Sequence, residues 1–165
     1  MIKQLLDCSV CLQCRGCCRF SEGNSIWVPV LSSAEQDSVS KACPGEGVVA
    51  GGRLATVPAP EEGLHYCVLF SPSGNSCRLY SRRPLECRLY PFLINLNPDN
   101  GRVFLCLDMN CPFAAEHHKD SSFREYAGYL AEYLNSPARL EFFRREKRLL
   151  QSYPGEMPEF AEIKI

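Results

Sequence analysis

Cysteine is the residue type in this sequence whose number and spacing point to chemistry. The chain of 165 residues carries 11 cysteines, and the stretch "CSVCLQCRGCC" (8–18) holds five of them. Two residues between cysteines let a tight turn aim both sulfurs at one ion, while backbone amides donate hydrogen bonds to the thiolates. The spacing is typical of both zinc and iron–sulfur ligation. The cysteines lie at positions 8, 11, 14, 17, 18, 43, 67, 77, 87, 106 and 111.

The setting of these cysteines favours metal binding over disulfides. Their number is odd, and the first residues, "MIKQLLDCSVC", show no apolar segment followed by a small-residue cleavage site. We therefore expect a reducing, cytoplasmic location. Clustered cysteines in that location bind metal more often than they form disulfides.

We call the cysteine-dense stretch 8–18 the cysteine ladder. Two of its cysteines, Cys17 and Cys18, are adjacent. In an extended backbone, neighbouring side chains point to opposite faces. On that geometry we expect the two sulfurs to reach different metal ions, or different irons of one cluster.

The four letters "CRLY" occur twice, at 77–80 and 87–90, so each copy places an arginine beside a cysteine. Four thiolates leave a zinc ion or a cubane cluster with a net negative charge, and nearby positive charge favours the thiolate. Solvated surface is the simpler interpretation for Arg15 and Arg83. Arg82 and Arg88 are our candidates for contacting the bound group. Arginines near cysteines in sequence are Arg15, Arg19, Arg78, Arg82, Arg83 and Arg88.

The ordered set "CLQCRGCCRF", "YCVLF", "CRLY", "RRPLECRLYPF" and "CPF" resembles the CxxCxxCC (YkgJ-type) cysteine-cluster proteins, which are described as zinc- or iron-chelating domains. The resemblance covers residues 11–113, and its most specific phrase runs from Arg83 to Phe92. It implies an initial and a later set of four metal ligands. These are Cys11, Cys14, Cys17 and Cys18, then Cys67, Cys77, Cys87 and Cys111.

Three cysteines, Cys8, Cys43 and Cys106, are additional to that pattern. Cys106 competes with Cys111 as the eighth ligand, and the resemblance favours Cys111 because it expects a Cys-Pro pair there. Cys8 is an alternative within the ladder. Cys43 is most simply a small buried residue or an unligated thiol.

Other residue types give weaker signals. His117 and His118 are alternatives for a mixed site, although a solvated helix start is the simpler interpretation. His65 is placed beside Cys67 and is a candidate for the surroundings of the metal. The basic stretch 142–150 is interpreted as a charged helix face, because the formal net charge of -1 gives no general attraction to nucleic acid.

Length and composition predict one small domain, residues 1–165, of the α+β class. We expect a loop-rich, metal-organised cysteine core (8–113) with short strands and hairpins, followed by a helical extension (121–151). The predicted hairpins join 66–70 to 77–80 and 92–96 to 102–106. Capping boxes are predicted at Ser32 with Glu35 and at Ser122 with Glu125. A further helix is predicted after Ser136 and Pro137, and an extended or loose tail follows it.

The resulting prediction is a metal-binding protein that holds an iron–sulfur cluster, [4Fe–4S], or two smaller centres, through eight cysteines, with a role in electron transfer, sensing or assembly. A structural zinc module (Zn2+) that presents a surface to a protein partner is the alternative, and a metal chaperone is a third. No Gly-rich nucleotide loop is found, so no catalytic residue is assigned. No apolar run has the length of a membrane helix, so no membrane is expected as a partner. Nucleic acid is not expected either, because the chain as a whole is not basic.

Overall fold

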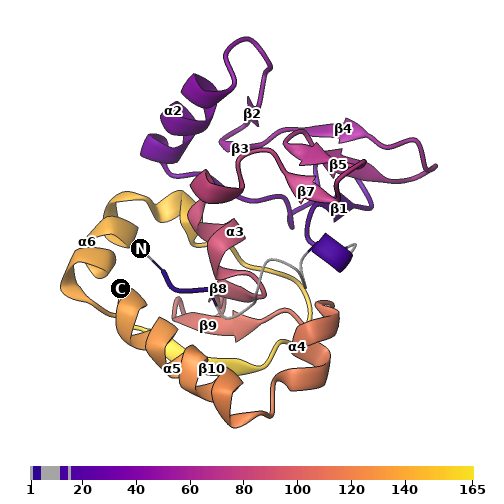
Figure 1. Ribbon diagram of the computed structural model, residues 1–165. Helices are drawn as coiled ribbons and strands as arrows, with labels where there is room; N and C mark the ends of the chain where they lie inside the picture. The colour runs from indigo at the N-terminus through magenta and orange to yellow at the C-terminus, as the bar shows by residue number, and fades with distance from the viewer. Residues whose placement is uncertain (1, 5–11, 15) are drawn as a thin grey trace. The chain divides into compact units, whose positions relative to one another are not determined.

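The computed structural model describes residues 2–4, 12–14 and 16–165 (Figure 1). Helices and small antiparallel sheets are mixed along the chain, which confirms the predicted α+β class. The chain divides into two compact units. We call Leu6–Arg88 the cysteine-rich unit, and Met1–Leu5 together with Leu89–Ile165 the sheet–helix unit.

Strands in the cysteine-rich unit are only two or three residues long. One antiparallel sheet has the order β1-β5-β4, and two further pairs are β2–β3 and β6–β7. One helix, α2 (Ser33–Ala42), and a 3-10 turn, η1 (Tyr80–Arg82), accompany them, and α3 (Leu85–Leu89) follows at the unit boundary. The strands are β1 (Arg19–Phe20), β2 (Val49–Ala50), β3 (Arg53–Leu54), β4 (Thr56–Pro58), β5 (His65–Cys67), β6 (Phe70–Ser71) and β7 (Ser76–Cys77).

The hairpin predicted for 66–70 and 77–80 is smaller than expected. Its paired residues are those of β6 and β7, while β5 pairs with β1 and β4 instead. Residues 78–80 leave the strand, and Tyr80 begins η1. The prediction is therefore confirmed only in part, because the apolar run 66–70 turns at Val68 and Leu69 and is thereby divided between β5 and β6.

Helix α2 begins where the sequence predicts. The Ser32 hydroxyl accepts a hydrogen bond from the Glu35 amide at 3.3 Å, and the Glu35 carboxylate accepts one from the Ser32 amide at 2.9 Å. This reciprocal pair is the predicted capping box, and it is confirmed. The other Glu35 oxygen accepts from the Leu85 amide at 2.6 Å, so the same carboxylate also fixes the first residue of α3.

Three five-residue strands form the sheet of the sheet–helix unit, in the order β10-β9-β8. Strands β8 (Phe92–Leu96) and β9 (Val103–Leu107) flank the turn "NPDNG", where Gly101 has φ +70°. The second predicted hairpin is therefore confirmed. The tail predicted to be extended provides β10 (Glu159–Ile163), which pairs antiparallel with β9.

Helices of this unit are α4 (Pro112–His117), α5 (Ser121–Leu134) and α6 (Pro137–Arg145), followed by the 3-10 turn η2 (Lys147–Leu149). Helix α5 lies alongside β10 (Figure 1). It buries one apolar face, as the helical spacing predicts. That face consists of Phe123, Ala127, Leu130 and Leu134.

The start of α5 corrects one prediction, and the start of α6 confirms another. Asp120, rather than Ser121 or Ser122, precedes α5 as its N-cap, so no capping box forms at Ser122. The Asp120 carboxylate instead contacts His117 Nδ1 at 2.9 Å. Helix α6 has Ser136 as its N-cap and Pro137 in its first turn, as predicted.

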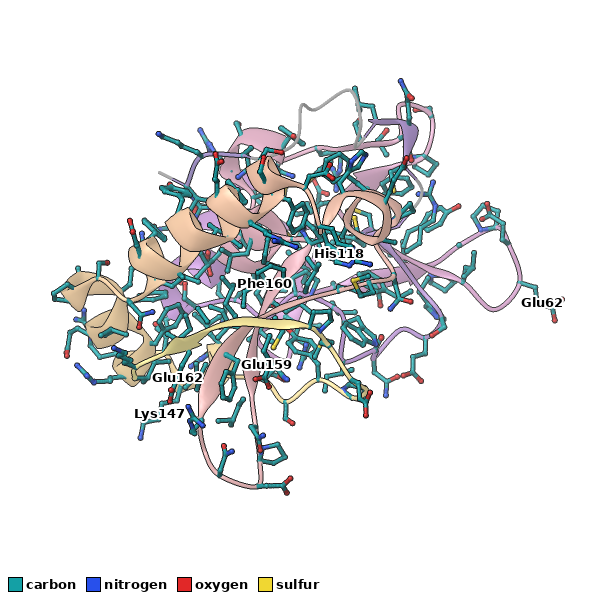
Figure 2. The ribbon with its side chains drawn as sticks, turned by 90° about the horizontal axis from the view of Figure 1, so that it is seen from below. Glu62, His118, Lys147, Glu159, Phe160 and Glu162 are labelled. Atoms are coloured by element: carbon teal, nitrogen blue, oxygen red, sulfur yellow. The ribbon has the colours of Figure 1, made fainter. Side chains whose placement is uncertain are left out.

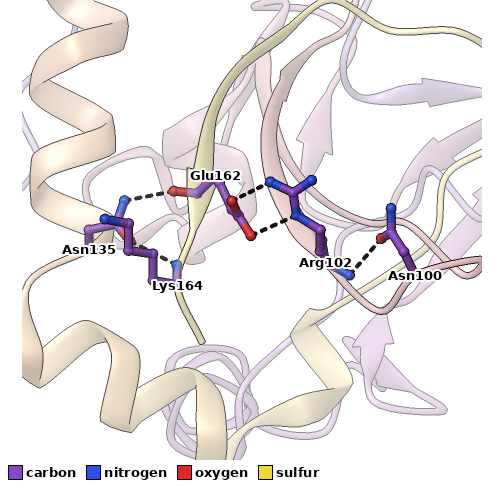
Figure 3. A network of polar contacts seen from close by, with 5 residues as sticks. All are labelled: Asn100, Arg102, Asn135, Glu162 and Lys164. Atoms are coloured by element: carbon purple, nitrogen blue, oxygen red, sulfur yellow. Dashed lines mark hydrogen bonds and ion pairs between the residues drawn. The ribbon is translucent and has the colours of Figure 1, made fainter.

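A polar network ties the end of α5 to the sheet (Figure 3). The Arg102 guanidinium pairs with the Glu162 carboxylate, with Nε at 2.9 Å from Oε1. Asn135 donates to the Glu162 carbonyl at 3.0 Å and accepts from the Lys164 amide at 2.9 Å. Figure 2 shows Glu159, Phe160 and Glu162 along the same strand, and the Phe160 ring packs on Phe92 with 5.6 Å between centroids.

Candidate metal centre

Six of the eight predicted ligands lie in the described part of the cysteine-rich unit. They come from different elements: the loop before β1, the ends of β5 and β7, and the middle of α3. Cys111 belongs to the sheet–helix unit, while Cys11, Cys8 and Arg15 fall outside the described residues. No described cysteine is in a disulfide. The six are Cys14, Cys17, Cys18, Cys67, Cys77 and Cys87.

Four of these thiols are electrostatic neighbours. Burial raises the pKa of Cys87 well above its ordinary value, and the charges of Cys67, Cys17 and Cys77 raise it further. Burial also raises the pKa of Cys67 from 9.0 to about 11, with smaller contributions from Cys77 and Cys17. Since charge interactions of this kind decay with distance, the structure brings Cys17, Cys67, Cys77 and Cys87 together.

Backbone pairing fastens the cysteine ladder to this group. Strand β1, which directly follows Cys18, pairs with β5, so that Arg19 lies opposite Tyr66. The Cys67 amide donates to the Cys18 carbonyl at 3.0 Å. The adjacent pair and Cys67 are therefore held in register by main-chain hydrogen bonds.

Two of the sulfurs receive hydrogen bonds from the backbone. The Leu69 amide donates to the Cys67 sulfur and the Leu79 amide to the Cys77 sulfur, and each bond lowers the thiol pKa against the effect of burial. Each donor lies two residues after its cysteine, so the chain turns back over the sulfur. An N–H group only donates, and a thiolate accepts better than a thiol, so this geometry suits the ligating form.

The adjacent cysteines differ from the expectation of an extended backbone. Residues 17 and 18 form a turn, and the Cys17 and Cys18 side chains hydrogen-bond to each other. This bond is the largest cause of the raised Cys17 pKa, ahead of burial. Cys17 itself is exposed. The extended geometry was wrong; separate roles for the two sulfurs stay a prediction.

The donor set fits a thiophilic metal. In residues 2–4, 12–14 and 16–165, no three His, Cys, Asp or Glu side chains are arranged so that they could hold a metal ion, so binding would require the thiols to move closer together. The buried thiols keep their protons because their pKa values are raised, and a bound cation would replace those protons and stabilise the thiolates. Thiolates are the ligands that zinc and iron–sulfur clusters share.

Positive charge at the thiols comes from Arg83 and Arg78. The Arg83 charge lowers the pKa of Cys17 and Cys77, and its guanidinium lies 3.7 Å from the Tyr80 ring centroid. The Arg78 charge lowers the pKa of Cys67 and Cys77, and its guanidinium pairs with Glu46 at 2.7 Å. The sequence interpretation of Arg83 as surface missed this role, although its place beside Pro84 in the most specific phrase was a signal.

The remaining arginine and histidine candidates are placed as follows. Arg82 is exposed, Arg88 is half-buried, and their proposed contact with the bound group stays a prediction. His65 lies on β5 two residues from Cys67, and its Nδ1 is buried. His117 is the last residue of α4 and His118 is its C-cap, so the predicted helix start is wrong and both residues lie at a helix end (Figure 2 labels His118). His118 Nδ1 lies 3.1 Å from the Ala114 carbonyl, and His117 contacts Asp120.

The other cysteines are buried in packed surroundings. Cys43 is 6 % exposed in the core of its unit, as expected for a small buried residue. Cys106 is fully buried in β9, where burial and then Glu159 raise its pKa to about 11 while an Asn95 hydrogen bond lowers it. Cys111 is the N-cap of α4.

Comparison with known proteins identifies the family of the chain. Neither the curated proteins nor the solved structures gave a match. Within the ranges that the structure describes, no helix is both long and apolar enough to cross a membrane. Residues 10–112, more than half of the chain, match the CxxCxxCC family model, whose description is "Putative zinc- or iron-chelating domain". The chain therefore belongs to the CxxCxxCC family.

Proposed function

We propose that the cysteine-rich unit holds an iron–sulfur cluster, in the form [4Fe–4S], and serves electron transfer, sensing or cluster assembly. The observation that carries this proposal is the group of Cys17, Cys67, Cys77 and Cys87, whose thiols interact with one another. Four thiolates are the number that a cubane cluster takes. The family match supports metal binding. The choice of an iron–sulfur cluster goes beyond that match and is our proposal.

The unit offers more thiols than one centre with four ligands needs. Cys14 and Cys18 lie in the same loop as Cys17, so the described part of the unit offers six predicted ligands, two more than either a tetrahedral zinc site or one cubane cluster takes. A polynuclear centre, or one that exchanges ligands during assembly, uses such a surplus. Cys11 and Cys111 would complete the predicted eight.

The residues around the sulfurs suit a negatively charged centre. Amide donors at Cys67 and Cys77 would hold the thiolates and, with burial, set the reduction potential of a bound cluster. Arg78 and Arg83 would offset its charge. When bound, the cluster supplies one-electron chemistry; the chain supplies burial, hydrogen bonds and positive charge.

A structural zinc module is the second candidate. One observation favours it: the group of four interacting thiols equals the ligand set of a closed zinc site built from four cysteines. In that case the centre would stabilise the unit, and a protein partner would bind the folded surface. A site that loses its metal to a mild chelator within minutes would instead indicate a metal chaperone.

The test is metal and acid-labile sulfide analysis of protein purified without oxygen and without a metal-bearing resin. Iron with equal sulfide and visible absorption supports the cluster; zinc without sulfide contradicts it and supports the zinc module. Cys67→Ser should lose most of the metal in either case. Cys106→Ser is the matched control, because Cys106 is equally buried but lies in the sheet–helix unit, and it should keep the metal.

The same analysis on Cys111→Ser tests the eighth predicted ligand. Loss of metal from this variant, with Cys106→Ser unchanged, supports the eight-cysteine set. Full retention by Cys111→Ser restricts the ligands to the cysteine-rich unit.

A further inference from the structure

Asn75 joins the cysteine ladder to the β6–β7 hairpin, and no motif in the sequence marks it. Its side-chain amide donates to the Leu12 carbonyl at 2.5 Å and to the Cys14 carbonyl at 2.6 Å. Its Oδ1 accepts from Arg19 Nη2 at 3.1 Å. Because Asn75 lies two residues before Cys77, one side chain links the loop of Cys14 to the hairpin that ends at Cys77.

Arg19 anchors the other side of this link. Its guanidinium lies 4.5 Å from the Phe70 ring centroid and 5.5 Å from that of Tyr66. Phe70 begins β6, Tyr66 precedes Cys67 on β5, and Arg19 itself follows Cys18. The arginine thus holds the Asn75 oxygen in place from β5, which bears Cys67, and from β6, which pairs with the strand that bears Cys77.

The backbone at this position selects the residue type. Asn75 is the one described residue other than glycine with positive φ, at +46°. Asparagine tolerates this left-handed conformation better than most side chains. It also supplies two amide hydrogens for the two carbonyls and one oxygen for Arg19, so all three hydrogen bonds use its amide group.

We propose that Asn75 is a positioning residue for the metal centre: it holds the loop of Cys14 in place and thereby slows metal release. This inference rests on the proposed metal-binding function, but it is the same for zinc and for an iron–sulfur cluster. Asn75 is not a metal ligand, because its polar side-chain atoms are hydrogen-bonded to the Leu12 and Cys14 carbonyls and to Arg19.

Two substitutions separate the side chain from the backbone strain. Asn75→Asp keeps the tolerated φ and an oxygen for Arg19, but places carboxylate oxygens against the Leu12 and Cys14 carbonyls. Asn75→Gly keeps the turn and removes all three bonds. Asn100→Asp is the control, since Asn100 lies in the β8–β9 turn and its side chain accepts from the Arg102 amide at 2.9 Å.

The experiment uses two measurements on the full chain. In the metal-free, reduced protein, iodoacetamide alkylation of Cys14 is followed by mass spectrometry. In the protein loaded with zinc alone, transfer of zinc to a chromogenic chelator is timed. The loss of two hydrogen bonds in Asn75→Asp and of three in Asn75→Gly should make both rates roughly tenfold faster in each variant, and both rates should stay unchanged in Asn100→Asp.

The outcomes distinguish the inference from the proposed function. Equal Cys14 alkylation in the wild type and Asn75→Asp overturns the inference, as does faster alkylation with unchanged zinc release. Similar acceleration by Asn100→Asp also overturns it, because the effect would then be general destabilisation. Failure of the proposed cluster is seen in the wild type alone, as zinc without sulfide, and failure of metal binding altogether is seen there as a chain that takes up neither zinc nor iron.

Discussion

The two units of the chain close their cores in different ways. The sheet–helix unit has strands of five residues and a helix of 14, and its largest fully buried side chains are Phe and Leu, such as Phe92, Phe123 and Leu130. The cysteine-rich unit has strands of two or three residues. Its core includes Cys43 and Cys67, with Cys18, Cys77 and Cys87 packed against it.

This difference shows what regular structure supplies and what must replace it. Long strands and helices pair their backbone groups internally and present continuous apolar faces. Short strands joined by loops bury less apolar surface per residue, and small domains of this kind gain stability from metal cross-links. We therefore expect the cysteine-rich unit to depend on metal and the sheet–helix unit to be indifferent to it.

Metal removal gives the largest expected effect. Structural metal sites contribute roughly 10–16 kcal/mol of apparent binding free energy in small domains, so a stripped cysteine-rich unit should lose most of its protection. Hydrogen exchange measured by mass spectrometry, with and without metal, should show faster exchange in β5, β7 and α3 and no change in β8, β9 and α5. Equal protection of both units in the metal-free protein would remove the proposed distinction.

Leu130→Ala should destabilise the other unit. Leu130 is fully buried on α5, and a truncation of this kind costs about 2–5 kcal/mol of unfolding free energy. Metal content should be unchanged, because the substitution lies in the sheet–helix unit. Urea unfolding followed by circular dichroism measures the cost, and Met109→Ala, at an exposed side chain, is the control expected to change little. Loss of metal from Leu130→Ala would show that the centre depends on both units.

Alkaline pH should destabilise the metal-free cysteine-rich unit through its buried thiols, and bound metal should prevent this loss. The Cys67 pKa is raised from 9.0 to about 11. As the pH rises above 9, the Cys67 thiol therefore loses its proton in the unfolded chain before it does so in the folded chain. The stabilisation is complete below pH 9 and lost between 9 and about 11, a change of about 2–3 kcal/mol at 1.36 kcal/mol per unit. Metal should abolish this loss, because ligating sulfurs are already deprotonated.

The reporter for this pH experiment is Trp27, the single tryptophan, which packs against the core of the cysteine-rich unit. Its fluorescence during urea unfolding of reduced protein at pH 8 to 11 should show the loss only without metal. Cys106, raised to about 11 in the sheet–helix unit, provides an internal comparison. The contribution of Cys106 to the free energy of unfolding should fall as the pH rises, whether or not metal is bound. If metal prevented the loss of stability in both units, the assignment of the metal centre to the cysteine-rich unit would be contradicted.

Local signals were enough to predict much of this molecule. The Asn-Gly turn predicted the β8–β9 hairpin, helical spacing predicted the buried face of α5, and Ser32 with Glu35 predicted the start of α2. Each signal lies within a few residues, where propensity and capping act directly. The ordered cysteines likewise predicted the family, because their spacing is visible in the sequence.

What sequence reasoning missed depends on contacts between distant residues. Helix α3, which carries Cys87, has only five residues, and Glu35 holds its start across 50 positions. Asn75 reaches the Cys14 carbonyl across 61 positions. No periodicity or capping rule records such contacts. The turn at Cys17 and Cys18 was missed for a related reason, since the assumption of extended backbone ignored Gly16 just before it.

The capping box of α2 gives the smallest expected effect and tests how far the cysteine-rich unit is coupled. Ser32→Ala removes the hydroxyl that accepts from the Glu35 amide, which should cost about 1 kcal/mol of unfolding free energy. Trp27 fluorescence measures the cost in metal-loaded protein, and Ser38→Ala, at an exposed position of the same helix, should be neutral or stabilising. Metal content should stay constant, because Glu35 keeps its bond to the Leu85 amide. A loss of metal in Ser32→Ala would mean that the cap orients Glu35 for α3, and that Cys87 is positioned through α2.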